Sequence, residues 1–181
     1  MGVIALVVII IVGSIIGTYN SMVTAKAGVD ESFSNIQTQL QRRADLIPNF
    51  VNTVKGAAEF EQTTLTDVTK ARGAVAGATD AQSLSKASGE LDKAISVWVN
   101  AVTESYPQLK ANSNFTALQD ELAGTENRIA VARKDFNAVA KEYNVKITKF
   151  PANIFAGMFG FEKTAYFEAD EASQSVPQVN F

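Results

Sequence analysis

The feature that most constrains this chain is an uncharged run near its N-terminus. Residues 2–17 read GVIALVVIIIVGSIIG, and the apolar character extends to about Tyr19. A helix needs about 20 apolar residues to cross a bilayer, so this run is close to sufficient. A cleaved signal peptide would carry basic residues first, whereas Lys26 is the first basic side chain here. We therefore expect residues 1–19 to be a retained transmembrane anchor in a lipid bilayer, rather than a cleaved signal or a buried soluble helix.

Two glycines lie four positions apart inside the predicted anchor. Gly13 and Gly17 fall on one helix face, with Ser14 and Thr18 beside them. Small residues at this spacing let a second helix approach closely in lipid, although the same spacing also arises by chance. We expect this face to contribute to helix packing in a homo-oligomer. The orientation signal is a single residue, Lys26, which favours a cytoplasmic location for the following domain.

The next segment carries the signature of a long helix. Between residues 21 and 45 no proline occurs, and apolar residues recur at steps of three, four and seven. We expect the anchor to continue into this segment as one helix of about 45 residues, or about 65 Å. Pro48 is expected to end that helix, because proline disfavours helical geometry at the preceding residue, and to begin a second helix reaching about Arg72.

Two further helices are expected after a glycine-containing connection. Thr79 or Asp80 can cap the third, and Asn112 or Ser113 can cap the fourth, which Pro151 closes. Apolar steps of three and four run through about five heptads of the fourth helix, as in helices that pack knobs into holes. The expected fold class is all-α: a long antiparallel bundle of about four helices whose first helix continues from the transmembrane segment.

The expected organisation has three parts: an anchor (1–19), an antiparallel helical bundle (20–150) and an aromatic-rich C-terminal segment (151–181). The last part can cap one end of the bundle or lie on the membrane surface. We expect the cap, because the segment carries acidic residues where anionic lipid would attract Lys or Arg.

Charged residues occupy positions on the predicted apolar faces. Arg43 falls on the stripe of the first helix and Glu61 on that of the second, and one face of the fourth helix carries polar residues at helical spacing. An unpaired buried charge is very costly, so each needs a partner. We expect a structural polar network that fixes helix register, made of Arg43, Glu61, Arg72, Glu126 and Arg133, with Asn137 as a linking amide.

Composition excludes several kinds of site. The chain has no His and no Cys, so Ser-His-Asp and Cys-His catalysis, His/Cys zinc sites and iron–sulfur clusters are ruled out. Glu61 and Glu126 could act as acid and base or hold two metal ions, but the di-iron pattern needs Glu-x-x-His motifs and nearby arginines would compete with a metal. Sixteen basic against 19 acidic residues give no footprint for nucleic acid. We expect no catalysis, cofactor, metal or nucleic-acid partner.

Short motifs occur in a characteristic order over nearly the whole chain: YN at 19–20, LQRRADLIPNFV at 40–51, KAR at 70–72, YPQLKAN at 106–112, LQDELAGTENRIAVAR at 118–133 and FP at 150–151. In this order they resemble the LemA family. Departures are Ala44, Phe60 and Phe136, where the family often has an aromatic residue, His and Tyr. The resemblance implies a single-pass protein of the bacterial cell membrane, with a long-helix bundle and no established activity.

The expected function is a membrane-anchored helical scaffold that self-associates and presents its bundle for protein–protein interaction. The alternative is an adaptor or regulator of a membrane protease or envelope-stress system. That alternative follows by association only, since members of the family are often encoded near such proteins. An enzyme with a carboxylate-only site is a third class, and it is disfavoured because acid, base and nucleophile candidates do not converge.

Overall fold

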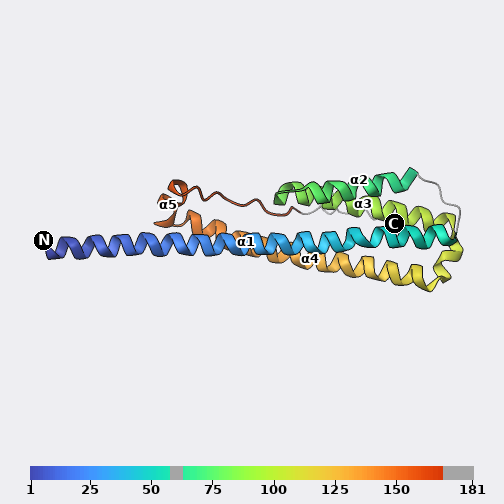
Figure 1. Cartoon of the computed structure of the whole chain (residues 1–181), viewed down its shortest axis with the longest axis horizontal. Helices are drawn as coiled ribbons and strands as arrows, with labels where there is room; N and C mark the ends of the chain where they lie inside the picture. Colours follow the sequence, from blue (N-terminus) through green and yellow to red (C-terminus); the bar gives the residue numbers. More distant parts are fainter. Residues whose placement is uncertain (58–62, 169–181) are drawn as a thin grey trace, which may run out of the picture.

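The computed structural model of the chain describes residues 1–57 and 63–168. These residues form five α-helices and one 3-10 helix, with no β-strand among them (Figure 1). In chain order the elements are α1 (Gly2–Ala57), α2 (Thr63–Gly77), α3 (Ala81–Ser105), η1 (Pro107–Ala111), α4 (Ser113–Thr148) and α5 (Ala152–Met158).

The four long helices alternate in direction along one axis. α1 and α3 run one way and α2 and α4 the other, α1 packs along α4, and α2 packs against α3 (Figure 1). The Lys146 ammonium donates to the Ser21 carbonyl at 3.4 Å, and the rings of Phe33 and Phe136 lie 6.2 Å apart. These pairs define the antiparallel register of α1 and α4. The expected all-α antiparallel bundle is confirmed.

The expected helix break at Pro48 is wrong. α1 is one helix of 56 residues, about 84 Å long, with Pro48 inside it, and α2 begins only at Thr63. A proline within a helix removes a hydrogen bond and costs about 3 kcal/mol. Burial offsets this cost, because Phe50 and Val54 on the following two turns are almost wholly buried. The Phe50 ring lies 4.9 Å from the ring of Trp98 on α3.

The two later caps follow the expected chemistry. The Asp80 carboxylate accepts hydrogen bonds from the backbone N–H groups of Gln82 and Ser83 at 3.0 and 2.9 Å, and these bonds lower its pKa, with Ser83 the largest cause. Asn112 accepts from the backbone N–H groups of Asn114 and Phe115 at the start of α4. Asp80 and Asn112 are therefore the caps among the residues that the sequence left open.

The first third of α1 is unlike the rest of the helix. Its large apolar side chains between Val3 and Ile16, apart from half-buried Ile15, are 48–76 % exposed, whereas Met22, Val29 and Ile36 further along are buried in the core. This part of α1 projects beyond the bundle (Figure 1). Among the described residues, α1 is the one helix that is long and apolar enough to cross a membrane.

The chain after α4 folds back on itself. α5 packs against α1 and α4, burying Ala152 and Ala156. Gly160 ends it with φ of +73°, a conformation that glycine adopts without strain, and the Phe161 N–H bonds to the Ala156 carbonyl at 2.9 Å, as in a Schellman motif. Residues 161–168 then run back along the bundle without regular secondary structure (Figure 1).

Candidate functional site

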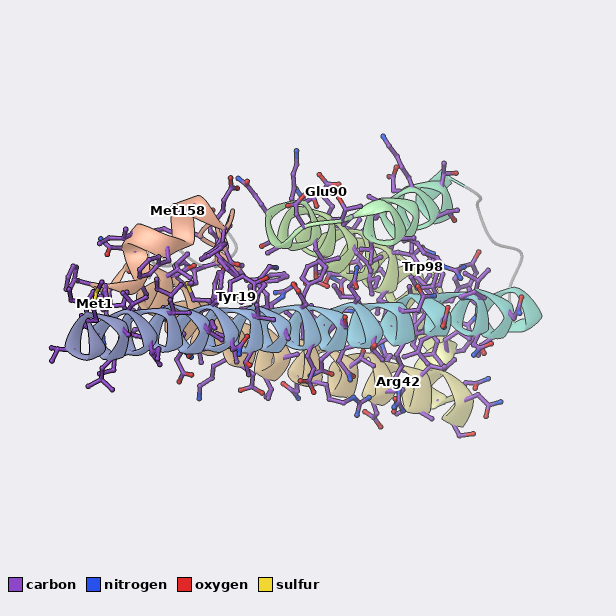
Figure 2. All side chains as sticks on the ribbon, turned by 60° about the vertical axis from the view of Figure 1, so that its left-hand side comes forward. Met1, Tyr19, Arg42, Glu90, Trp98 and Met158 are labelled. Atoms are coloured by element: carbon purple, nitrogen blue, oxygen red, sulfur yellow. The ribbon has the colours of Figure 1, made fainter. Side chains whose placement is uncertain are left out.

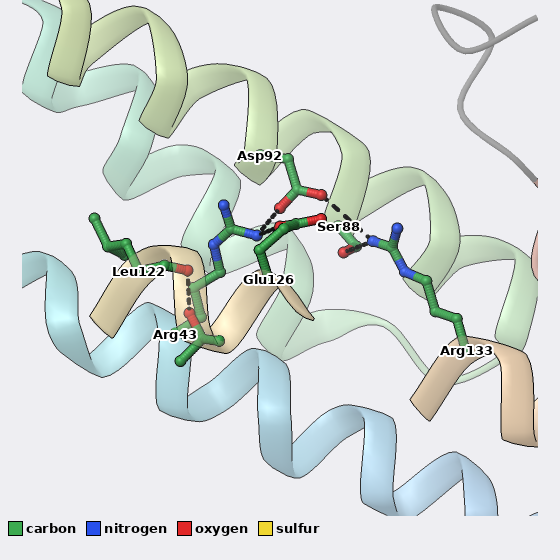
Figure 3. A network of polar contacts seen from close by, with 7 residues as sticks. Arg43, Ser88, Asp92, Leu122, Glu126 and Arg133 are labelled. Carbon is green, nitrogen blue, oxygen red and sulfur yellow. Dashed lines mark hydrogen bonds and ion pairs between the residues drawn. The ribbon is translucent and has the colours of Figure 1, made fainter. Parts of the chain in front are cut away.

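Charged side chains from three helices meet in the middle of the bundle. The Arg43 guanidinium on α1 donates to the Asp92 carboxylate on α3 at 2.6 Å and also contacts the Glu126 carboxylate on α4 (Figure 3). Arg133 on α4 reaches the other Asp92 oxygen at 3.4 Å and donates to the Ser88 hydroxyl. We call these five residues the charge network. Asp92 lies at its centre, because it contacts both arginines.

The network is only partly screened by solvent. The side chains of Arg43 and Asp92 are 7 % and 19 % exposed, and Ser88 is fully buried. Burial lowers the pKa of Arg43, Asp92 opposes this effect, and the positive charge of Arg133 adds to it. Arginine side chains in proteins stay protonated at neutral pH. The buried charge of Arg43 therefore depends on its carboxylate partners.

The structure brings together three of the six predicted network residues: Arg43, Glu126 and Arg133. Arg72 is elsewhere, because it contacts Asp45 at 3.3 Å in an exposed ion pair. Glu61 lies outside the described residues. Asn137, the expected linking amide, bonds instead to the backbone of Phe167.

Asp92 and Ser88 were missed by sequence analysis. Both lie on α3 at a spacing of four: Ser88 is part of the buried stripe that includes Leu84 and Leu91, and Asp92 lies at its edge. A signal was present for Ser88, because a polar residue on an apolar stripe needs a hydrogen-bond partner once it is buried. Asp92 lies at the edge of the stripe and gave no such signal.

A second group of polar contacts holds the returning C-terminal segment against α4. The Asn137 side chain donates to the Phe167 carbonyl at 2.9 Å and accepts from the Phe167 N–H at 2.8 Å. The Asn144 side chain likewise donates to the Thr164 carbonyl at 2.8 Å and accepts from the Thr164 N–H at 2.9 Å. The Tyr143 hydroxyl donates to the Glu162 carbonyl at 2.9 Å. We call Asn137 and Asn144 with their two partners the asparagine clamp.

The spacing of the clamp follows from the geometry of its two backbones. Seven residues of α-helix rise about 10.5 Å, which separates Asn137 from Asn144. Three residues of extended chain span about 10 Å, which separates Thr164 from Phe167. Each side-chain amide presents one donor and one acceptor, so it pairs with a backbone N–H and C=O as a neighbouring strand would. The match explains why an extended segment can lie along α4 in one register.

The charge network and the asparagine clamp both join separate elements of the fold. Within residues 1–57 and 63–168 no three His, Cys, Asp or Glu residues lie close enough to hold a metal ion. Asp92 and Glu126 both contact the guanidinium of Arg43, which competes with any cation for their oxygens. The arrangement can hold α1, α3 and α4 in register and fasten the returning segment.

The two glycines in the first third of α1 have free space beside them. Gly13 and Gly17 have nothing within 4 Å of the position that a Cβ atom would take. No described part of the chain therefore covers the face that carries them.

Comparison with known proteins places these observations in a family. A model of the LemA family matches residues 32–181. Magnetosome protein MamQ 2 of Paramagnetospirillum magneticum is 26 % identical over 194 residues, which covers 93 % of this chain and 71 % of the relative. Magnetosome protein MamQ of Magnetospirillum gryphiswaldense is 26 % identical over 190 residues, covering 89 % and 70 %. Protein LemA of Metamycoplasma hominis is 26 % identical over 157 residues, covering 86 % and 71 %.

Proposed function

This chain belongs to the LemA family, and we propose that it is a membrane-anchored helical scaffold that self-associates and presents its bundle to other proteins. The observation that carries the proposal is the continuity of α1. One uninterrupted helix joins an exposed apolar segment to the buried core.

The lengths of the two parts of α1 fit this role. The 18 residues from 2 to 19 rise about 27 Å, close to the ~30 Å of a bilayer core. The same helix then contributes buried residues from Met22 to Val54. With no linker between the two parts, the bundle is held at a fixed height above the membrane, as a platform for partners requires.

Self-association is proposed to use the face with Gly13 and Gly17. Apolar side chains gain nothing by leaving lipid for one another, so helices in a bilayer associate where small residues let their backbones approach. Both glycines are open to a second helix. Our proposal puts the bundle on the cytoplasmic side, because Lys26 follows the anchor closely.

Crosslinking of the full chain in phosphatidylcholine vesicles tests the proposal. Carbonate washing should leave the wild-type chain with the vesicles, and the crosslinked sample should show a defined oligomer. Gly13→Ile combined with Gly17→Ile should reduce that oligomer, because the larger side chains block close approach while the segment stays apolar.

Ala5→Ile is the matched control, since it also replaces a small residue of the anchor by Ile, but outside the helix face that carries Gly13 and Gly17. Release of the wild-type chain by carbonate would exclude anchoring. A monomer that binds a membrane protease would favour the adaptor role over the scaffold. Equal oligomer in all three proteins would exclude the glycine face.

A further inference from the structure

A cluster of large apolar side chains is exposed on α5 and on the residues that flank it. Phe150, Ile154 and Met158 are 80 %, 53 % and 74 % exposed, and Phe159 is 46 % exposed. Together these four residues form what we call the α5 face. Beyond the first third of α1, the other exposed large apolar residues of the described chain are scattered: Tyr19, Val23, Val97, Val131, Val145 and Tyr166.

The opposite side of α5 fixes its orientation. Ala152 and Ala156 are buried against the bundle, so their small side chains let α5 lie close to α1 and α4. The large side chains are therefore directed away from the protein. Figure 2 labels Met158 on α5, next to the exposed apolar part of α1.

Contacts with Tyr19 set the level of α5 along α1. The Tyr19 ring lies 4.9 Å from the ring of Phe159 and 5.8 Å from that of Phe161, both edge-on. Tyr19 ends an apolar run that rises about 27 Å from residue 2, close to the thickness of a bilayer core. An aromatic ring with a polar tip is favoured at this boundary. α5 consequently lies at the height where the membrane surface meets α1.

Basic residues outnumber acidic ones near this level: Lys146, Lys149 and Lys163 stand against one carboxylate, that of Glu162, which follows Phe161. Lys146 bonds to the Ser21 carbonyl, which places it just above Tyr19, and Lys149 follows one turn nearer the anchor. No Asp or Glu occurs between Tyr143 and Phe161.

The acidic residues of the C-terminal segment argued against a membrane contact at the level of the sequence. For Glu168 the asparagine clamp removes this objection, because the neighbouring residue Phe167 is bonded to Asn137. Asn137 lies 12 helical residues from Lys149, or about 18 Å further from the anchor. The negative charge of Glu168 is therefore carried away from α5.

We propose that α5 lies in the headgroup layer of the bilayer that α1 crosses, with the α5 face inserted among the lipids and Lys146 and Lys149 directed to anionic headgroups. A short apolar face beside basic residues is the chemistry of an interfacial helix. This inference rests on the anchoring of α1 proposed above. The bundle is then attached at two points, which sets its tilt as well as its height.

Single-cysteine variants of the full chain test the proposal, because the natural sequence has no Cys. Met158→Cys reports on the α5 face and Ile9→Cys on the anchor. Val131→Cys is the matched control, since it is an exposed apolar position of α4 within the bundle. Each variant carries an environment-sensitive fluorophore in vesicles of phosphatidylcholine with phosphatidylglycerol. Aqueous iodide and a lipid with a brominated chain serve as the two quenchers.

The proposal expects the label at position 158 to be quenched by brominated lipid and to show several-fold less iodide quenching than the label at 131. The label at 9 should be quenched by brominated lipid alone. If positions 9 and 131 behave as expected but 158 follows 131, the α5 inference is overturned and the anchor stands. If 158 is protected from both quenchers, protein rather than lipid covers the α5 face, and the inference is again overturned. If the label at 9 is not quenched by lipid, the anchoring itself fails.

Discussion

The charge network and the asparagine clamp each use two α4 side chains seven residues apart, yet they bind very different partners. Glu126 and Arg133 meet charged and polar groups of α1 and α3. Asn137 and Asn144 bind the backbone of a segment that follows α4 in the chain. The same helical spacing thus serves a contact between helices in one place and a contact with an extended segment in the other.

The two regions also differ in how completely their polar groups are paired. In the clamp, each asparagine uses a donor and an acceptor on one residue of the segment. In the network, the Nε–H groups of Arg43 and Arg133 are buried without a hydrogen-bond acceptor in the described residues. Neutral amides can be matched by backbone alone, whereas buried charges need counter-charges and leave part of their hydrogen-bonding capacity unused.

The largest effect is expected from Arg43→Met, which leaves Asp92 partly buried without its closest cation. Breaking a buried ion pair typically costs ~3–5 kcal/mol, and the partial exposure of the network puts this case near the lower end, at about 3 kcal/mol. Urea unfolding of the full chain in mild detergent, followed by circular dichroism, measures the loss.

Arg42→Met is the control for this prediction. Arg42 is the neighbouring residue and contacts Glu121 at 3.0 Å, but both side chains are exposed, so its loss should cost at most about 1 kcal/mol. Asp92→Leu in the Arg43→Met background should restore part of the stability, because it removes the carboxylate that Arg43→Met leaves without its closest cation. The recovery should be incomplete, since Arg133 and Glu126 each lose a partner as well. Equal stability of the two arginine variants would show that the network is solvated and would remove the contrast with the clamp.

A smaller and more local effect is expected from Asn144→Ala. The N–H and C=O of half-buried Thr164 lose their partners, and each such hydrogen bond contributes about 0.5–1.5 kcal/mol. The segment can escape this cost by detaching, so hydrogen exchange at the Thr164 amide should accelerate by about tenfold or more while exchange in α1 changes little.

Asn127→Ala provides the comparison for the clamp, because it removes an exposed asparagine from the same helix. Its effect on exchange at Thr164 should be negligible. If the Asn144 variant instead lowered the protection of α1 and α4 throughout, the clamp would be part of the cooperative core, as the network is expected to be.

Sequence periodicity predicted the parts of this structure that repeat. The stripe through Met22, Val29 and Ile36 is buried as expected, and the placement of Arg43 on that stripe indicated a buried charge with partners. Asp92 escaped notice because a carboxylate at the edge of an apolar stripe has the same pattern as a solvated one. Its position between buried Leu91 and exposed Lys93 only acquires meaning once α1 brings Arg43 beside it.

The continuation of α1 through Pro48 and the partner of Asn137 could not be predicted from local sequence rules, for different reasons. Pro48 is a strong signal for a helix end, but the packing of Phe50 and Val54 outweighs it, and packing is a property of the whole fold. The partner of Asn137 is the backbone of Phe167, and a backbone group has no distinctive residue type by which a sequence could reveal it. The clamp is therefore visible only in three dimensions.

The smallest effect is expected from the pH dependence of Tyr143, whose neutral hydroxyl holds Glu162 beside the clamp. Its pKa is raised above the ordinary value of 10.0, first by burial and then by the negative charges of Asp30 and Glu162. Below about pH 10 both the folded and the unfolded chain keep this proton, so its contribution to stability is complete. As the pH rises further, the unfolded chain releases the proton first, and the free energy of unfolding should fall. Urea midpoints measured from about pH 8 to about pH 11 should therefore decline more steeply for the wild type than for Tyr143→Phe, whereas Tyr166→Phe, which changes an exposed tyrosine, should follow the wild type. Identical slopes in all three proteins would mean that the hydroxyl ionises freely in the folded chain, and the region of the clamp would then tolerate a charge as the network does.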